Sequence, residues 1–204
     1  MSVHPAAMYD ELLVAPPEQV VLRRDDGHVT PLALDRWLGQ SNLVDEAVAQ
    51  AAVGPVLDIG CGPGRLLDAL ARHGHWALGV DLSPVAVGLA RRRGRRAVLG
   101  SVFDDLPGVG DWATALLLDG NIGIGGDAAV LLARVRTLLR PGGSAIVEVE
   151  PPGAGTRGGR VRLEQGDVTS LWFPWAHVDA DGIRELADVA DLRCIGGRWF
   201  AWVA

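Results

Sequence analysis

The chain contains no lysine, because all 19 of its basic residues are arginine, and its formal net charge is −6. An acidic balance argues against a partner held through nucleic-acid phosphates. The densest basic run, residues 91–96, is predicted to end a helix instead. Cations are favourable at the negative end of a helix dipole, and Gly94 suits the residue after the last turn. We therefore expect no nucleic-acid partner.

Cysteine and long apolar runs are also scarce. The two cysteines, Cys61 and Cys194, are too few for a disulfide framework, and we expect Cys61 to be a small packing residue rather than a nucleophile. No charge-free run approaches the roughly 20 residues that cross a bilayer, and the first residues lack a basic and then apolar signal segment. The histidines show no metal-ligand spacing. We expect a cytoplasmic protein with no membrane partner and no metal.

The order of the predicted elements indicates an α/β fold. From Val56 onward, strands alternate with helices, which implies a parallel sheet covered on both faces. Residues 1–52 precede this pattern and contain a hairpin signal around an Asp-Gly turn at 20–30 and a helix at 41–52. The strands are predicted at 55–60, 76–80, 97–102, 113–118 and 144–150. An insertion with aromatic content near 151–177, a helix at about 179–190, and a hairpin around Gly196 and Gly197 follow.

The most informative stretch runs from Val56 to Arg65. Its apolar half predicts a buried strand. Gly60, Gly62 and Gly64 then let the backbone turn sharply and approach a ligand, at the start of a helix whose free N–H groups point toward that ligand. Asp58 would repel a pyrophosphate and attract a cation, and the G-x-G-x-G spacing differs from the dinucleotide fingerprint G-x-G-x-x-G.

This stretch resembles motif I of the class I S-adenosylmethionine-dependent methyltransferases. The resemblance implies a three-layer αβα sandwich with a seven-stranded, mostly parallel sheet and an antiparallel C-terminal hairpin. It implies S-adenosyl-L-methionine as the cofactor and S-adenosyl-L-homocysteine as its product. In the family this loop holds the methionine and ribose parts of the cofactor, and the acidic residue lies near the amino group. The cofactor residues so assigned are Asp58, Gly60, Cys61, Gly62 and Gly64.

Two further positions follow from the resemblance at the ends of the second and third strands. Asp81 is expected to accept hydrogen bonds from both ribose hydroxyls, with Leu82 beside it. Ser101 and Val102 are expected near the adenine, where the family usually has an aspartate in place of Ser101. The serine hydroxyl still accepts a hydrogen bond but carries no charge, and Asp104 is a candidate substitute acid.

The end of the fourth strand faces the transferable methyl in the family. Asp119 and Asn121 are therefore candidates for holding the cofactor's amino group or for orienting the acceptor, as catalytic residues. The glycine-rich residues 123–126 are expected to open room above the methyl and to lead into a helix N-terminus that could hold an anionic acceptor. A flexible turn is the alternative. The Leu138–Gly143 segment is a frequent family signature with a structural role.

Peripheral residues are expected to complete the site. Residues 1–52 are predicted to form a helical and hairpin cap over the cofactor, in front of a core at 53–204. Tyr9 and Arg36 lie in this cap, and Arg36 either pairs with the methionine carboxylate or is solvated. The aromatic residues 172–175 either line an acceptor pocket or pack in the core. His177 is the candidate general base, and a structural role is its alternative.

The predicted function is in-line methyl transfer from a sulfonium to a small-molecule acceptor, by a monomer or homodimer. An NAD(P)-dependent oxidoreductase is one alternative, although Asp58, the glycine spacing and the closing hairpin oppose it. The second alternative is a methyltransferase-like module that binds the cofactor without catalysis. The third is a macromolecular acceptor, which an acidic chain without a basic arm fits less well.

Overall fold

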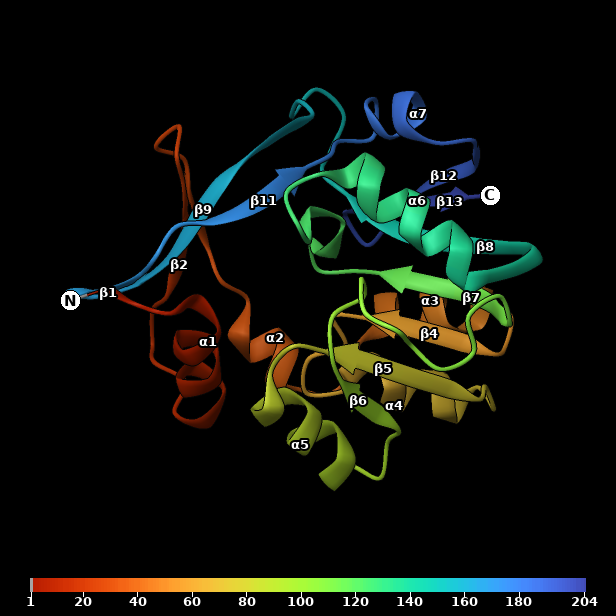
Figure 1. Ribbon diagram of the computed structural model, residues 1–204, viewed down its shortest axis with the longest axis horizontal. Coiled ribbons are helices and arrows are strands. Elements are labelled where there is room, and N and C mark those ends of the chain that lie inside the picture. The colour runs from red at the N-terminus through yellow and green to blue at the C-terminus, as the bar shows by residue number, and fades with distance from the viewer. Residues whose placement is uncertain (1) are drawn as a thin grey trace.

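The computed structural model describes residues 2–204 and contains a seven-stranded sheet. Five neighbouring strands are parallel, and two antiparallel strands close one edge (Figure 1). In spatial order the strands are β12 (Val189–Ile195), β13 (Arg198–Val203), β8 (Leu139–Val149), β7 (Trp112–Leu117), β4 (Val56–Ile59), β5 (Ala77–Asp81) and β6 (Ala97–Leu99). The predicted mostly parallel sheet with an antiparallel C-terminal hairpin is confirmed.

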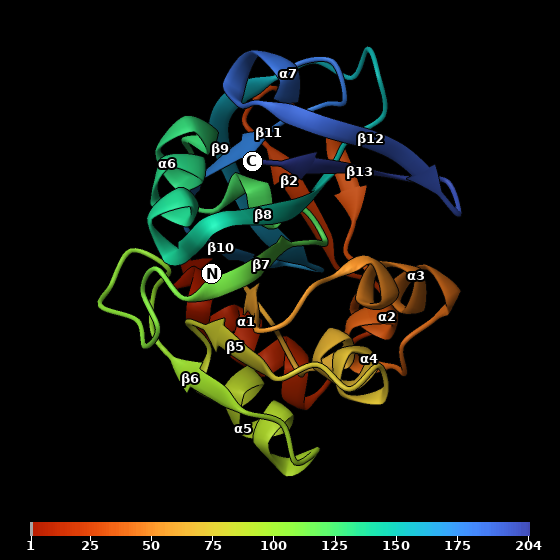
Figure 2. The same ribbon diagram turned by 90° about the vertical axis from the view of Figure 1, so that its right-hand side faces the viewer.

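Helices cover both faces of this sheet, which explains why β4 and β7 are buried along their whole length. One face packs against α6 (Ala128–Leu138) and α7 (Ile183–Leu186), and the other against α3 (Leu43–Ala51), α4 (Arg65–Arg72) and α5 (Pro84–Arg92). Figure 2 shows α6 on one side of the strands and α3 and α4 on the other. Across residues 2–204, no helix combines the length and the apolar composition that crossing a bilayer requires.

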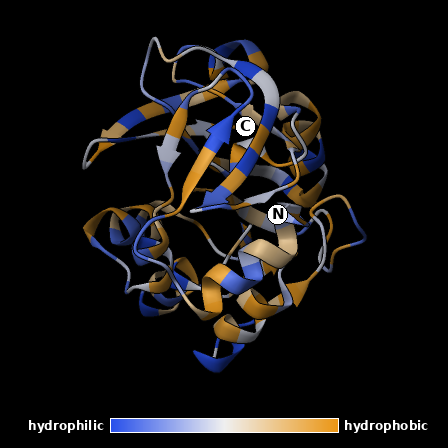
Figure 3. Cartoon of the chain, turned by 90° about the vertical axis from the view of Figure 1, so that its left-hand side faces the viewer, coloured by the Kyte–Doolittle hydropathy of each residue, from blue (hydrophilic) through white to orange (hydrophobic). Residues whose placement is uncertain are grey.

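A second sheet joins the N-terminal segment to the insertion that follows β8. It contains β1 (Ser2–Val3), β10 (Val168–Ser170), β9 (Arg157–Gln165), β2 (Val21–Arg24), β3 (Val29–Pro31) and, paired with β9, β11 (Phe173–His177). Hydrophilic and hydrophobic residues alternate along it (Figure 3), as in a sheet with one packed face. We call it the cap sheet.

The packed face of the cap sheet rests on α1 (Pro5–Val14) and α2 (Leu34–Leu38). Met8 and Leu12 from α1 and Leu163 from β9 form a small separate core there, and Tyr9, Trp37 and Phe173 pack against it. The predicted N-terminal hairpin and the predicted insertion are thus parts of one sheet, since β2 pairs directly with β9.

Three predicted elements have a boundary that differs from the structure by three residues or more. The helix predicted at 179–190 is a single turn, Ile183–Leu186, because Val189 already pairs with Val203 and draws the chain into β12. β6 ends at Leu99 instead of residue 102. β8 begins at Leu139, opposite Trp112, and its Pro-Gly-Gly stretch falls where the register with β7 shifts.

Candidate active site

The glycine turn after β4 lies at the carboxyl end of the parallel strands, between Ile59 and α4. Gly60, Gly62 and Gly64 all have positive φ, at 70°, 52° and 89°. A Cβ on Gly60 would meet the Asn121 amide at 2.5 Å, and one on Gly64 would meet Ala90 at 3.0 Å. A Cβ on Gly62 would meet only the Tyr9 hydroxyl, at 3.5 Å. Two glycines are therefore required by packing, and Gly62 faces the side that the cap covers.

Asp81, the last residue of β5, holds this turn. Its Oδ2 accepts from the Gly62 N–H over 2.8 Å, and its Oδ1 accepts from the Ser83 N–H over 2.9 Å. Each carboxylate oxygen has two lone pairs, so each keeps capacity for a hydroxyl donor. Burial raises the pKa of Asp81, and these backbone donors oppose that shift. Leu82 follows with 64% of its surface exposed.

Tyr9, a residue of α1, lies next to the glycine turn. Its ring meets Trp37 edge to face, with centroids 6.1 Å apart. Burial and the negative charges of Asp81, Asp10 and Asp119 raise the pKa of Tyr9. Its hydroxyl therefore stays protonated and can donate a hydrogen bond into the space above Gly62.

The segment after β6 folds into a turn around Ser101. The Ser101 N–H donates to Asp104 Oδ2 over 2.8 Å, and the Ser101 hydroxyl accepts from the Phe103 N–H over 3.2 Å. Val102 is buried, while Phe103 is 42% exposed. The Asp104 carboxylate thus lies beside Ser101, and its role as a substitute acid stays a prediction.

Asp58 is a buried carboxyl in the middle of the site. Only 3% of its surface is exposed, and its Oδ2 has no hydrogen-bond partner within the described residues. Burial raises the pKa of Asp58 to about 7, and Asp119 and Asp81 add to the shift while Arg65 opposes it. An unpaired buried oxygen of this kind fits a ligand that brings a positive charge or a donor.

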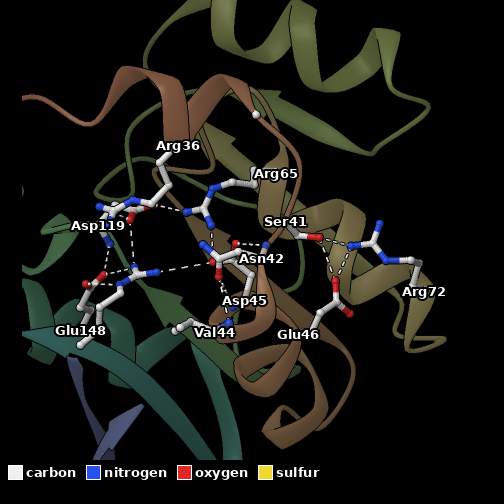
Figure 4. Close-up of polar contacts among 12 residues, drawn as sticks. Arg36, Ser41, Asn42, Val44, Asp45, Glu46, Arg65, Arg72, Asp119 and Glu148 are labelled. Atoms are coloured by element: carbon white, nitrogen blue, oxygen red, sulfur yellow. Dashed lines mark hydrogen bonds and ion pairs between the residues drawn. The ribbon is translucent and has the colours of Figure 1, made fainter. Parts of the chain in front are cut away.

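Beside Asp58 lies a group of six charged side chains from six different elements or turns, which we call the charged cluster. Its members are Arg36, Asp45, Arg65, Asp119, Glu148 and Arg198. Figure 4 shows Arg36 and Arg65 both directed at Asp119, over N–O distances of 2.9 and 2.5 Å. Three cations balance three anions, as burial of charge requires.

Asp119 is the centre of this cluster. It is the one non-glycine residue in the described chain with a positive φ, 55°. Its side chain pairs with Arg36, Arg65 and Arg198, and its backbone N–H donates to Glu148 over 2.5 Å. Strained backbone of this kind persists only where the surroundings fix it.

Sequence reasoning missed Asp45, Glu148 and Arg198 as members of the site. Asp45 is recognisable only as part of the capping box of α3, where it accepts from the Asn42 N–H over 2.8 Å. Arg198 enters from the C-terminal hairpin, 79 residues from Asp119. No local pattern reports such a pairing.

Asn121 lies beneath the glycine turn rather than above it. Its amide donates to the carbonyls of Ile59 and Gly60, over 2.8 and 3.0 Å. These two bonds use both amide hydrogens. The observed contact is therefore one that positions the turn.

The glycine-rich segment after Asp119 does not open room. A Cβ on Gly123 would overlap the Trp175 ring, and one on Gly126 would overlap Pro174 at 2.6 Å. The expectation of space at these positions is wrong, because β11 packs against η1 (Asn121–Gly123). The following helix N-terminus is occupied too, since Asp127 accepts from the N–H groups of Ala129 and Val130.

His177 ends β11 and pairs with Glu150, just beyond the carboxyl end of β8. Its Nδ1 lies 2.7 Å from Glu150 Oε1, and its Nε2 is buried with no partner in the described chain. The aromatic residues before His177 make two separate sets of contacts. Phe173 and Trp175 meet edge to face at 6.0 Å, whereas Trp172 stacks with Arg162.

Comparison with known proteins agrees with this geometry. Residues 56–143 match the family described as "Methyltransferase domain". A ubiquinone biosynthesis O-methyltransferase of Acinetobacter baylyi is 28% identical over 50% of this chain and 46% of its own length. A ribosomal protein L11 methyltransferase of Dechloromonas aromatica is 31% identical over 70% of this chain and 43% of its own length. The chain thus spans about half the length of the curated relatives it matches.

Solved structures share the whole architecture. A SAM-dependent methyltransferase from Bacteroides fragilis, in complex with S-adenosyl-L-homocysteine, superimposes with a TM-score of 0.77 at 19% identity, covering 98% of this chain and 93% of that one. The fold is therefore that of the class I S-adenosylmethionine-dependent methyltransferases. Residues 56–143 thus match a methyltransferase domain within a chain that has this fold.

Proposed function

We propose that the chain is an S-adenosylmethionine-dependent methyltransferase whose acceptor is a small molecule. The observation that carries the proposal is the turn held by Asp81, together with the nearby Asp58 carboxyl, whose buried Oδ2 has no partner in the described chain. A nucleoside with two ribose hydroxyls and a positively charged tail satisfies both carboxylates. A dinucleotide diphosphate brings no ammonium group for the buried Asp58 carboxyl.

The residues present fit the cofactor part by part. Asp81 would accept from the ribose hydroxyls, and Leu82, Ser101 and Val102 would border the adenine. The exposed apolar surfaces of Leu82 and Phe103 suit a flat base. When bound, the cofactor supplies an activated methyl on a sulfonium whose leaving group is neutral.

The charged cluster would hold the amino-acid end. Arg36 and Asp119 are paired at 2.9 Å, and the Arg36 side chain is 34% exposed. A zwitterion can exchange into such a pair, with its carboxylate on Arg36 and its ammonium on Asp119 or Asp58. Arg65 and Arg198 keep Asp119 oriented during this exchange. The protein's contribution to rate is then mainly alignment, which is worth roughly 7–11 kcal/mol in well-oriented reactions.

Several observations support a small-molecule acceptor. α1 brings the Tyr9 hydroxyl close to Gly62, and the cap sheet packs on α1. The chain is acidic, with a net charge of −6. A 1,6-didemethyltoxoflavin-N1-methyltransferase from Burkholderia thailandensis, solved with 1,6-didemethyltoxoflavin, is similar in fold, with a TM-score of 0.59 at 23% identity over 79% of this chain and 76% of that one. A protein acceptor is the second candidate, since one relative is a ribosomal protein L11 methyltransferase.

Substitution of Asp81 tests the cofactor assignment. Asp81→Ala removes a charged acceptor, so S-adenosyl-L-homocysteine should bind about 10- to 150-fold more weakly, which corresponds to ~1.5–3 kcal/mol. Titration calorimetry measures the Kd, and Asp68→Ala is the matched control because Asp68 pairs with Arg93 and Arg95 on the surface of α4. An unchanged Kd for Asp81→Ala would remove Asp81 from the ribose site.

A further inference from the structure

We propose that the inner face of the cap sheet beside η1 is the acceptor site, that it takes a planar aromatic compound carrying a hydroxyl group, and that the Glu150–His177 pair removes the hydroxyl proton during methyl transfer. This inference rests on the proposed function and names the substrate class for that same site.

One face of β11 is directed toward the proposed cofactor residues. Phe173, Trp175 and His177 alternate along β11 and therefore share one face of the cap sheet. Phe173 packs in the same apolar cluster as Tyr9, whose hydroxyl faces the glycine turn. The inner face of β11 is thus the face that looks toward the cofactor residues.

Contacts through η1 place this face next to the end of β7. The Trp175 ring lies against Gly123, and Ile124 forms a bridge to Trp175. Gly123 is two residues from Asn121, which holds the glycine turn. Trp175 is partly buried and offers a ring surface for stacking, in an arrangement that its edge-to-face contact with Phe173 fixes.

Glu148 lies in β8 and Glu150 is the first residue past its end, where the extended chain continues in a bridge to Asp179. The two side chains, two residues apart, therefore point to the same face of the larger sheet. Glu148 contacts the Asp119 N–H. Two residues further along the chain, Glu150 Oε1 lies 2.7 Å from His177 Nδ1. The Glu150–His177 pair therefore adjoins the charged cluster on the side away from the ribose residues.

The hydrogen bond to Glu150 selects the tautomer of the neutral imidazole. An ionised carboxylate can only accept, so in the neutral ring the proton lies on Nδ1 and the lone pair on Nε2. Nε2 is buried and has no partner in residues 2–204, while the whole side chain is 12% exposed. A buried acceptor without a donor fits a substrate hydroxyl.

The surrounding charges are balanced. Glu150, just past β8, contacts the His177 imidazole, and Arg157 of β9 lies opposite His177 in the strand register. The Asp26 carboxylate of the β2–β3 turn interacts with His177 electrostatically. Arg24 and Arg157 both pair with Asp26, at 2.9 and 2.7 Å. Two cations and two anions leave no net charge to oppose a transient imidazolium.

Proton transfer to His177 accompanies methyl transfer from sulfur to oxygen. Nε2 takes the hydroxyl proton while an electron pair on the acceptor oxygen forms the bond to the methyl carbon. The carbon–sulfur bond breaks, and its electron pair stays on sulfur as a neutral thioether. The positive charge that leaves sulfur ends on the imidazolium, opposite Glu150.

A phenol whose visible absorption reports its ionisation tests this directly. 4-Nitrocatechol is added to the S-adenosyl-L-homocysteine complex of the full chain, at a pH where the free phenol is neutral. We expect the spectrum of the ionised phenol with the wild-type chain and with His73→Gln, and loss of that spectrum with His177→Gln. His73 is the matched control because its Nε2 lies 3.0 Å from Glu46 in an exposed pair elsewhere.

Turnover with S-adenosyl-L-methionine gives the second readout. His177→Gln should lower kcat for 4-nitrocatechol by about 100-fold or more with KM changed less than about threefold, and Glu150→Gln should lower it by about 10-fold. The acidic limb of the pH profile should disappear in His177→Gln. Calorimetry with S-adenosyl-L-homocysteine and thermal unfolding show that each variant is folded.

Failure of the proposed function and failure of the acceptor site give different results. Absence of S-adenosyl-L-homocysteine binding by the wild-type chain would remove the proposed function itself. Binding of that compound with no bound 4-nitrocatechol at millimolar concentration, or with an equally ionised phenol in His177→Gln, would overturn only the acceptor site.

Discussion

Asp58 shows how one buried side chain ties stability to ligand binding. Its pKa is raised to about 7 from an ordinary value near 3.8, chiefly by burial. Between these two values the folded chain holds a proton that the unfolded chain has released. The free energy of unfolding therefore falls as pH rises through this window, unless a positively charged ligand compensates.

Asp58→Asn should remove this pH dependence. Relative to the variant, the wild-type chain should lose up to about 4 kcal/mol of stability between pH 4 and pH 8, at ~1.4 kcal/mol per unit of pKa shift. Urea unfolding at several pH values measures the difference, and the unliganded variant should be the more stable form at pH 8. Parallel pH profiles for the two proteins would contradict this account of Asp58.

The proposed role of Arg36 is to bind the carboxylate at the amino-acid end of the cofactor. Arg36→Met should weaken binding of S-adenosyl-L-homocysteine by about 10-fold or more, because a charged hydrogen bond is lost. Binding of 5′-methylthioadenosine, which lacks the carboxylate and the ammonium, should stay unchanged.

The matched control for Arg36 is Arg72→Met. Arg72 is 54% exposed and pairs with Glu46 on the surface, where an ion pair contributes little. Calorimetry with both nucleosides on both variants decides the question. An equal loss for the two nucleosides would show that Arg36 supports the fold and does not contact the amino-acid end.

At the scale of elements, η1 packs closely against β11 because Gly123 has no side chain where the Trp175 ring lies. Gly123→Ala should destabilise the chain by at least about 1 kcal/mol, because the new Cβ would overlap the Trp175 ring and overpacking strains a filled site. Gly88→Ala, within α5 and with only the Arg92 guanidinium nearby at 3.5 Å, should be neutral or stabilising. Thermal unfolding of the two variants measures the contrast. Equal melting temperatures would mean that β11 moves freely over η1.

The elements that the sequence predicts well are those with local causes. β4 and its glycine turn follow from an apolar run and three alternate glycines. The N-cap Ser83 with Pro84 marks the start of α5, and the Ser83 hydroxyl accepts from the Ala86 N–H as such caps do. Predictions of this kind need only a few neighbouring residues.

Features with distant causes do not follow from the sequence. α7 is short because Val189 pairs with Val203, and β2 belongs to the cap sheet because Leu22 pairs with Leu163. The charged cluster likewise joins Asp45 to Arg198, which no periodicity or motif links. The proximity of these residues exists only after the sheets have formed.

At the scale of the whole molecule, the cap is built from two segments that lie more than 100 residues apart in sequence. Arg23 pairs with Glu164 at 2.8 Å across this junction, and the core of α1, α2 and β9 is separate from the two cores of the larger sheet. The packing of the N-terminal segment, which carries the proposed cofactor residues Tyr9 and Arg36, therefore depends on the insertion that also carries His177.

The measurement that bears most directly on the central claim is calorimetry of the full chain with S-adenosyl-L-homocysteine and, separately, with NADH. The claim is that a glycine turn flanked by Asp58 and Asp81 accepts a nucleoside whose tail carries an ammonium group and rejects a diphosphate. We predict saturable one-to-one binding of S-adenosyl-L-homocysteine at micromolar concentration and no heat of binding with NADH. Binding of NADH without binding of S-adenosyl-L-homocysteine would contradict the account.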